Sequence, residues 1–382
     1  MAVMSYKCPN CGAGLTFDPK TQQLRCEYCL SEFTEEAMKA LEAEEAKKEE
    51  SGREDEGKPE NAGMTAGEAA QNGEDVAEPE GSPGSDADSY KEDAVVYMCP
   101  NCGAEIVTDA TTAATFCYYC HNPVVLSGRV SGEYLPDYVL PFAIDRKKAE
   151  EMFINWIGKK KYVPASFYDK NQIEKLSGVY FPYLLYSCQV DGHLKGEGEK
   201  ETSQVIGNTR HTEHKRYKVE RSGSLDVKNL TRNALSKSNK ELVEGVLPFE
   251  TGELVPFQSG YLSGFLAEKR DMESEMFNDE AEQEVRDYTI ENLRSSISGY
   301  NSLKIQDSET RIRDAKWQYA LLPVWVLTYH HKEDKKTYYF AMNGQTGKIC
   351  GKLPVDKGKL VKLFAGVFAP LFAVLMIGGW FL

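Results

Sequence analysis

The sequence has no surplus of positive charge, and it lacks the short motifs that mark several common enzyme classes. It holds 45 Lys and Arg against 59 Asp and Glu, a formal net charge of −14. It has no GxxxxGK phosphate loop, and His211-Thr-Glu-His214 does not have the HExxH spacing of zinc proteases. Residues 1–7 carry no secretory signal. These absences argue against a P-loop nucleotide enzyme, a zinc protease and a secreted protein held by disulfides.

Most of the negative charge belongs to one tract that is nearly free of aromatic and branched apolar residues. Residues 41–93 hold eighteen Asp and Glu but only five Lys and Arg, so the rest of the chain is close to neutral. Such a composition cannot bury enough apolar surface to offset the entropy of ordering. We therefore expect residues 35–93 to form a disordered acidic linker that lets the segment before it sample a wide volume. The alternative is an acidic docking tail.

Ten cysteines are present, and eight of them form two matching sets of CxxC pairs. One set opens with Cys8-Pro9-Asn10-Cys11-Gly12 and the other with Cys99-Pro100-Asn101-Cys102-Gly103, and fourteen residues separate the two pairs of each set. Pro fixes φ in such a pair and Gly permits a left-handed backbone, so one tight turn presents both sulfurs to one ion. The sets predict two zinc ribbons, over residues 1–34 (ribbon one) and 94–126 (ribbon two), with the ligands Cys8, Cys11, Cys26, Cys29, Cys99, Cys102, Cys117 and Cys120.

Both sites are predicted to be structural zinc sites. Four Cys ligands leave no open position for water or a substrate, and zinc would supply most of the folding free energy of so small a unit, on the order of 10 kcal/mol. A rubredoxin-like iron site would use the same ligands, but Gly follows only the first pair of each set, which favours zinc over iron. Residues 117–121 also match a haem c attachment pattern, which would leave Cys99 and Cys102 unexplained.

Residues 127–355 are predicted to form an α+β body. Apolar residues at helical spacing run from the N-cap Asp145 to Gly158, and a second helix is expected over Glu280–Ile297. The expected strands are Val179–Val190 (followed by an Asp191-Gly192 turn), His214–Glu220, Leu321–Tyr329, Thr337–Met342 (after a Lys332–Lys336 turn) and Lys348–Leu353. Similar Pro-aromatic strand entries at 140–142 and 255–257, each followed by a helix and a strand, indicate either two similar halves or a coincidence.

The end of the chain has the composition of a membrane span. Residues 363–382 carry no charge, and at about 1.5 Å per residue they extend roughly 30 Å, the hydrocarbon thickness of a bilayer. Lys357, Lys359 and Lys362 precede them, and by the positive-inside rule these lysines stay in the cytoplasm. The sequence thus predicts a basic flank and transmembrane tail anchor over 356–382, in the cell membrane as a single pass, with the soluble part cytoplasmic.

The remaining candidate residues form no catalytic constellation. His330-His331 is predicted to be a strand end, Gly344–Lys348 a hairpin turn and Cys188 an inert core residue. We therefore expect no enzyme activity and identify no small-molecule substrate. Nucleic acid is also disfavoured as a partner, because affinity for it rests on neutralising phosphates and ribbon one carries three basic and three acidic residues.

The two CPNCG…CxxC ribbons, the stretches 261–268, 322–325 and 338–347, and the tail helix together resemble a family of bacterial tail-anchored zinc-ribbon membrane proteins. The similarity spans most of the chain outside the acidic linker. Members are often labelled as similar to primosomal protein N′ or to transcription initiation factor IIB, on account of the ribbons. The resemblance implies a cytosol-facing recruiter that works beside SPFH-domain (flotillin-like) and phage-shock-type envelope stress proteins. It carries over the eight cysteines and no catalytic residue.

These features predict a non-enzymatic zinc-ribbon adaptor that recruits protein partners at the cytosolic face of the membrane. One alternative is a nucleic-acid-binding zinc-ribbon regulator tethered to the membrane, which the charge count disfavours. The other is an enzyme with an unrecognised site in the body, which would require a concave pocket with convergent polar groups.

Overall fold

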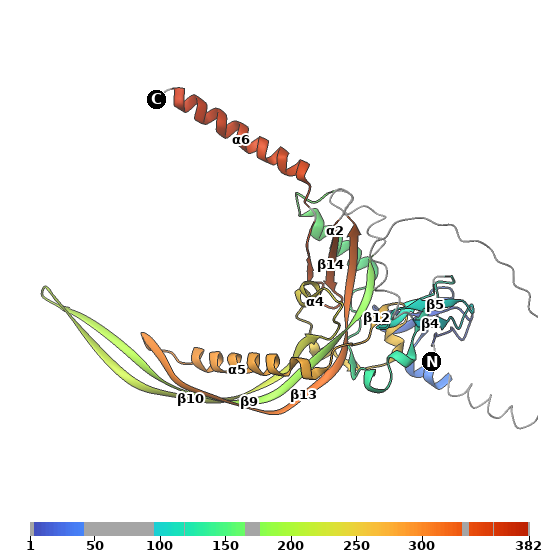
Figure 1. The fold of residues 1–382 in the computed structure, drawn as a ribbon, viewed down its shortest axis with the longest axis horizontal. Helices are drawn as coiled ribbons and strands as arrows, with labels where there is room; N and C mark the ends of the chain where they lie inside the picture. The colour runs from blue at the N-terminus through green and yellow to red at the C-terminus, as the bar shows by residue number, and fades with distance from the viewer. Residues whose placement is uncertain are drawn as a thin grey trace, which may run out of the picture.

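The computed structural model describes residues 4–41, 95–117, 119–164, 176–330, 336–353 and 355–380. Over these residues the chain is a sheet-rich α+β protein with one isolated C-terminal helix (Figure 1). The predicted linker after residue 41, Tyr118 and most of the predicted Lys332–Lys336 turn lie outside the described residues.

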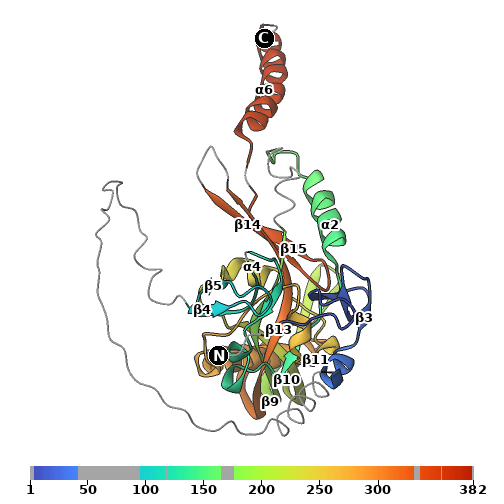
Figure 2. The same cartoon turned by 90° about the vertical axis from the view of Figure 1, so that its right-hand side faces the viewer.

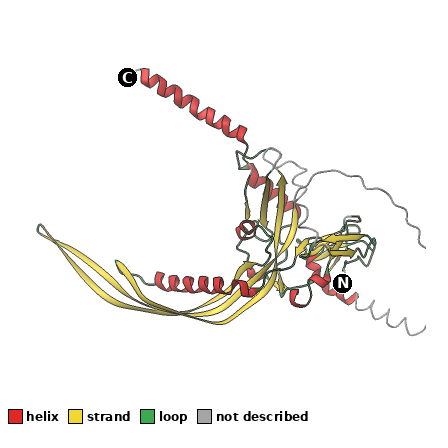
Figure 3. Ribbon diagram, viewed as in Figure 1, coloured by secondary structure: helices red, strands yellow, loops and turns green. Residues whose placement is uncertain are grey.

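Two small sheets belong to the ribbons, and one large sheet organises the body (Figure 3). Ribbon one holds β1 (Leu15–Asp18), β2 (Gln23–Cys26) and β3 (Glu32–Phe33), and ribbon two begins with the hairpin of β4 (Val95–Met98) and β5 (Glu105–Thr108). The large sheet has the order β11-β8-β13-β9-β12-β6-β7; its strands are β6 (Thr112–Phe116), β7 (Pro123–Val125), β8 (Tyr138–Val139), β9 (Ser177–Ile206), β11 (Val255–Pro256), β12 (Leu266–Glu268) and β13 (Ser302–His330). β10 (Thr209–Asn233) pairs with β9, and β14 (Thr337–Asn343) pairs with β13 and β15 (Ile349–Gly351).

The described residues hold few helices, and α2, α5 and α6 match the three that the sequence predicts. The helices are α2 (Arg146–Gly158), the short α4 (Lys240–Gly245), α5 (Asn278–Ser295) and α6 (Lys357–Trp380); the 3-10 turns are η2 (Ser127–Arg129), η3 (Gly132–Tyr134), η5 (Thr251–Glu253), η6 (Ser259–Leu262) and η7 (Ser274–Phe277). Residues 35–41 are also helical, which corrects the expected start of the disordered linker, because Met38 packs into the core. Asp145 caps α2 as expected, because its side chain accepts a hydrogen bond from Lys148 N at 3.0 Å.

The body repeats one order of elements, β8-α2-β9-β10 and then β12-α5-β13-β14. The two long strands β9 and β13 run antiparallel at its centre, with Pro182 opposite Leu321 and Pro323 opposite Tyr180. β8 lies parallel to β13 and β12 lies parallel to β9, so the two halves have a two-fold-like arrangement. The counterpart of β8 is therefore β12, and not the strand entry at 255–257. The latter belongs to β11, which pairs with β8 at the sheet edge, where Pro is tolerated.

The main core is rich in aromatic side chains that come from both halves. Phe142 stacks on Phe265 with ring centroids 4.3 Å apart, and it contacts Trp325 at 5.0 Å and Tyr180 at 5.1 Å. Phe153 on the buried face of α2 meets Phe340 of β14 at 4.4 Å. Aromatic pairs of this geometry each add about 0.5–1.5 kcal/mol beyond their area burial.

The C-terminal part of β9, the N-terminal parts of β10 and β13, and α5 form a long curved arm that projects from the body (Figure 1). The predicted turn at Asp191-Gly192 is wrong, because β9 continues through both residues to Ile206. Asp191 is part of the ladder, and its carboxylate accepts a hydrogen bond from Ser224 Oγ at 2.7 Å. The hairpin turns instead at Gly207, whose φ of +64° suits glycine.

Gly192 allows α5 to pack closely against the strands of the arm. A Cβ atom at this position would lie 2.8 Å from both Leu293 Cδ1 and Thr289 Cγ2 of the helix. Its cross-strand partner Gly223 is more open, since a Cβ there would meet Leu293 Cδ2 at 3.4 Å, an ordinary contact. The helix approaches the sheet closely at Gly192, and this explains an Asp-Gly pair inside a strand.

We expect Gly192→Ala to lower the free energy of unfolding by about 1–2 kcal/mol, because the new methyl group overpacks the contact with α5. Gly223→Ala is the matched control and should change stability by less than about 0.5 kcal/mol. Chemical denaturation followed by circular dichroism measures both. Equal effects of the two substitutions would contradict a specific close approach at Gly192.

The C-terminal helix α6 extends away from the body (Figures 1 and 2). Over Lys357–Met376 it is long and apolar enough to cross a membrane, and none of that stretch is buried within the protein. The helix begins at Lys357, so the three lysines of the predicted basic flank lie on its first two turns. A large apolar surface that no described part of the body covers needs another apolar environment.

Candidate metal centres

Each ribbon brings its four predicted thiols together. In ribbon one, Sγ of Cys8 lies 3.5 Å from Sγ of Cys29, and Sγ of Cys11 lies 3.5 Å from Sγ of Cys26. The corresponding distances in ribbon two are 3.7 Å between Cys99 and Cys120 and 3.6 Å between Cys102 and Cys117. Within each set all four sulfur atoms lie within 4.8 Å of one another, so each set could hold a metal ion.

The spacing of the sulfurs fits a tetrahedral ion. A tetrahedron with metal–sulfur bonds of about 2.3 Å has edges of about 3.8 Å. The observed separations of 3.5–3.7 Å are close to this edge length. In each ribbon one sulfur of each CxxC pair is buried, at Cys8, Cys26, Cys99 and Cys117, and its partner lies nearer the surface. In each set, two of the four thiols are thus shielded from solvent, and the other two lie at or near the surface.

Each CxxC pair is closed by a tight turn that ends in a left-handed residue. Gly12 N donates to Cys8 O at 2.8 Å and Gly103 N donates to Cys99 O at 2.9 Å, with φ of +74° and +73°. The predicted role of glycine after each first pair is therefore confirmed. The second pairs turn in the same way at Leu30 and His121, with φ of +60° and +55°. The sequence did not predict this, because bulky residues rarely adopt such a conformation.

The electrostatics of the thiols favour a bound cation. A hydrogen bond with the Ser31 hydroxyl lowers the pKa of Cys29 to about 6. The Ala13 backbone amide acts to lower the pKa of Cys11, but desolvation and the neighbouring thiols outweigh it and raise that pKa to about 12. Four adjacent thiols cannot all ionise alone, and a dication supplies the charge that lets them do so.

Ribbon one packs against the body and ribbon two, which differs from the expectation that it moves freely on a tether. Phe17 N donates to Ser263 O at 2.8 Å, and Ser263 Oγ donates to Leu15 O at 2.6 Å. The ring of Phe17 lies 5.0 Å from that of Tyr261, and Leu15 and Phe17 belong to the same core as Phe142 and Phe265. The physical reason is that so small a ribbon cannot bury Leu15 and Phe17 by itself, so these side chains pack into the core of the body.

The two ribbons also contact each other directly. Met4 and Val125 exchange backbone hydrogen bonds of 2.8 and 2.9 Å, and Asn122 Nδ2 donates to Ser5 Oγ at 2.5 Å. Close approach requires glycine at position 14, where a Cβ would lie 2.0 Å from Asn122 Oδ1. Ribbon two joins the body through the large sheet, with Thr112 of β6 opposite Glu268 of β12. The two metal centres are therefore parts of one packed structure.

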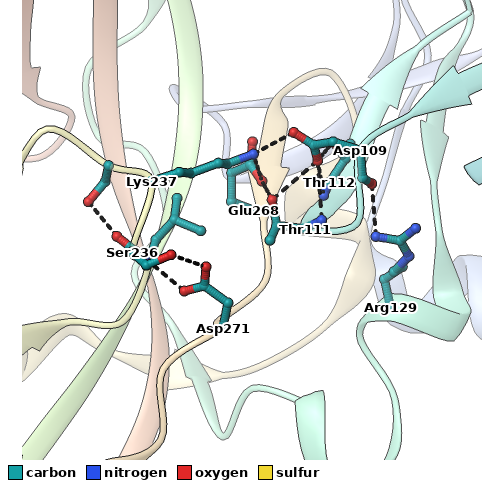
Figure 4. Close-up of polar contacts among 10 residues, drawn as sticks. Asp109, Thr111, Thr112, Arg129, Ser236, Lys237, Glu268 and Asp271 are labelled. Atoms are coloured by element: carbon teal, nitrogen blue, oxygen red, sulfur yellow. Dashed lines mark hydrogen bonds and ion pairs between the residues drawn. The ribbon is translucent and has the colours of Figure 1, made fainter. Parts of the chain in front are cut away.

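One ion-pair cluster links ribbon two to the body (Figure 4). Lys237 Nζ lies 2.6 Å from Asp109 Oδ2 and 3.0 Å from Glu268 Oε2. Burial acts to raise the pKa of Asp109, but hydrogen bonds from Lys237 and Thr112 hold it well below its usual range. Burial raises the pKa of Glu268 even with Lys237 beside it. Nothing in the sequence pairs Asp109 with Lys237 and Glu268, because both lie far along the chain from it.

We expect Lys237→Met to lower the free energy of unfolding by about 2 kcal/mol, because it leaves the half-buried Glu268 carboxylate without its cation. Lys240→Met is the matched control, since Lys240 pairs with Glu244 on the exposed face of α4 and such pairs contribute roughly 0.5 kcal/mol or less. Urea denaturation of both variants tests this. A loss no larger than that of the control would show that the cluster does not hold ribbon two in place.

The other described candidate residues lie in the elements that the sequence predicts for them. His214 lies on exposed β10 with Nδ1 2.7 Å from Glu199 Oε1, and residues 344–347 form the turn between β14 and β15. Cys188 is buried and burial raises its pKa. His331 and the side chain of His330 lie outside the described residues. None of the described candidates comes together with another in a catalytic arrangement.

The fold and the two thiol sets define a sheet-rich α+β protein with two four-cysteine centres and one apolar C-terminal helix. The chain is 30% identical over 384 residues to the uncharacterized protein YdjG of Bacillus subtilis (strain 168), an alignment that covers 99% of this chain and 100% of that protein. The chain therefore belongs to the same family as YdjG. No family model matches the sequence, and no solved structure matches it.

Proposed function

We propose that this protein is a membrane-anchored, non-enzymatic adaptor in which two zinc-bound ribbons form a platform for protein partners. The observation that carries the proposal is the combination of two packed four-cysteine centres and a terminal apolar helix in one chain. Zinc fits the two sets of four thiolates, which would hold it through Cys8, Cys11, Cys26 and Cys29, and through Cys99, Cys102, Cys117 and Cys120. With four protein ligands the zinc would stabilise the fold and supply no chemistry to a substrate.

The proposed anchor is α6, inserted as a single pass in the cell membrane. The lysines at its start favour a cytoplasmic position of everything before it, by the positive-inside rule. The apolar surface of α6 that the body leaves uncovered supports this placement. The platform would then work at the cytosolic face of the membrane.

The proposed recognition surface includes one exposed tyrosine from each ribbon. In both ribbons this tyrosine directly precedes the last cysteine of the second CxxC pair. Tyr28 is 85% exposed and Tyr119 is 73% exposed, which is unusual for large aromatic side chains on a neutral surface. Such side chains are enriched in protein interfaces, where they bury a large area at low entropic cost. The near-neutral charge of the ribbons favours a protein partner over nucleic acid. By family resemblance, an SPFH-domain (flotillin-like) protein is the proposed partner.

Site-specific photo-crosslinking in intact membranes tests the proposal. A photoreactive amino acid replaces Tyr28 or Tyr119, and the control position is Tyr288, which is 60% exposed on α5 far from the ribbons. We expect adducts that contain an SPFH-domain protein from positions 28 and 119 but not from 288. Adducts sensitive to nuclease would favour the alternative of a membrane-tethered nucleic-acid regulator. Equal labelling at all three positions, or none at 28 and 119, would overturn the recognition surface.

A further inference from the structure

An apolar groove of about 690 Å³ lies on one face of the large sheet, in a part of the body that the proposed adaptor function does not use. Its floor is a row of cross-strand neighbours: Ala341 opposite Val326, Val324 opposite Val179 and Val179 opposite Leu266. The row ends at ribbon two, where Glu268 lies opposite Thr112. It crosses β14, β13, β9, β12 and β6, and four spacings of about 4.8 Å give the floor a length of about 19 Å.

The walls of the groove are apolar over most of this length. Leu242 and Val243 of α4 form one wall, and Phe181 and Leu235 add to the apolar lining. A volume of about 300–1,000 Å³, apolar walls and a small number of polar groups are typical of small-molecule sites. The remaining lining is polar and includes Ser238, Asn239 and Thr328, so the groove offers both an apolar surface and hydrogen-bonding groups.

The charged groups gather at one end. Lys237 and Glu268 are the two charged side chains among the described residues that line the groove. Asp109 does not line it but pairs with the Lys237 ammonium (Figure 4). Lys237, Glu268 and Asp109 together carry a formal charge of −1, and Arg129, which donates to Asp109 O at 2.9 Å, lies on the side of Asp109 away from Lys237 (Figure 4). A ligand with an anionic head would be repelled there, whereas a cationic head would be attracted.

The Glu268 carboxylate still has hydrogen-bonding capacity. Its Oε2 accepts from Thr111 Oγ1 at 2.6 Å and pairs with Lys237 Nζ at 3.0 Å. Among the described residues no donor reaches Oε1, although the side chain is only 21% exposed. A half-buried carboxylate oxygen with open lone pairs gains most from a charged donor.

We propose that this groove binds an amphiphile whose apolar body lies along the sheet from β14 to β12 and whose protonated amine donates a hydrogen bond to Glu268 Oε1. Lys237 keeps Glu268 oriented through Oε2, and Asp109 offsets the charge of Lys237, so the ligand amine meets a net negative end. The site contains none of the eight cysteines, although β6 of ribbon two contributes Thr112, Ala114 and Thr115 to its lining. It is a concave pocket with polar groups that the sequence did not reveal.

Displacement of an uncharged fluorophore, N-phenyl-1-naphthylamine, tests the proposal with the full-length chain held in amphipol. The competitors are decylamine and decanoate, which share chain length and differ in the sign of the head. We expect decylamine to displace the fluorophore at a concentration about tenfold lower than decanoate, the difference that one charge-assisted hydrogen bond produces. In Glu268→Gln the two competitors should differ by less than about twofold while the fluorophore still binds.

Val326→Trp fills the floor of the groove and should weaken fluorophore binding at least about tenfold. Val205→Trp, at an exposed valine on the arm, is the matched control and should bind as the wild type does. Thermal unfolding verifies that each variant is folded. The proposal fails if wild-type protein does not prefer decylamine, if the preference survives Glu268→Gln, or if a folded Val326→Trp variant binds the fluorophore normally.

Discussion

Loss of the metal from ribbon one is expected to destabilise the whole body and not only the ribbon. In the double variant Cys11→Ser/Cys29→Ser, both substituted thiols are exposed, so the apolar packing is not changed directly. We expect the zinc content to fall from two to one per chain. The free energy of unfolding of the body should fall by about 3–5 kcal/mol, similar to the loss of one large buried aromatic side chain.

The physical reason is that ribbon one contributes to the central core. Without its metal the ribbon cannot fold, because so small a unit lacks enough buried surface of its own. Leu15 and Phe17 then leave the core, and Tyr261 loses its aromatic partner. For a body of this size the melting temperature should fall by roughly 10 °C.

Metal analysis and differential scanning calorimetry of the full-length protein measure the two effects together. Cys350→Ser is the matched control, since Cys350 belongs to neither metal centre, and it should leave the zinc content at two. An unchanged melting temperature in the double variant, together with loss of one zinc, would show that ribbon one folds separately from the body. Iron in place of zinc would contradict the proposed cofactor.

Two arginines in the middle of α6 are expected to release the protein from membranes. Val367 and Leu371 are both more than half exposed on this helix. An arginine at the centre of a spanning helix costs about 2.5–3.5 kcal/mol on insertion scales, so Val367→Arg/Leu371→Arg should cost about 5–7 kcal/mol. That penalty is large enough to move most of the protein from the membrane pellet to the soluble fraction after alkaline extraction.

The conservative double variant Val367→Ile/Leu371→Ile keeps the apolar surface and should stay in the pellet. Intact metal content in the soluble arginine variant would show that the body folds without the anchor. If the arginine variant remains in the pellet as fully as the control, α6 is not the anchor, and the membrane placement proposed for this protein is wrong.

Local patterns predicted which cysteines come together, and they predicted several helices and strands. The spacing of the eight cysteines was sufficient because a CxxC turn is closed by residues within five positions, as the bonds from Gly12 to Cys8 and from Gly103 to Cys99 show. The N-cap Asp145 and the apolar face of α2 were readable for the same reason.

Glycine at position 192 shows where local reading fails. In sequence, Asp191-Gly192 is indistinguishable from a hairpin turn, and only the presence of α5 above the strand reveals that the glycine accommodates a helix. The same limit hid the Lys237 cluster, whose members Asp109 and Glu268 are far apart along the chain. Contacts between distant segments depend on the sheet order, which no local pattern contains.

The sequence alone determined that this protein has two four-cysteine sets, a near-neutral body and one terminal apolar helix, because each of these follows from composition or from spacing within a few residues. The tertiary structure decided that both ribbons pack into one assembly with the body, that β9, β10 and β13 extend into an arm, and that a groove with a charged end lies across five strands. These features depend on which apolar faces meet, and burial against a distant segment lowers the free energy only once the whole sheet is assembled.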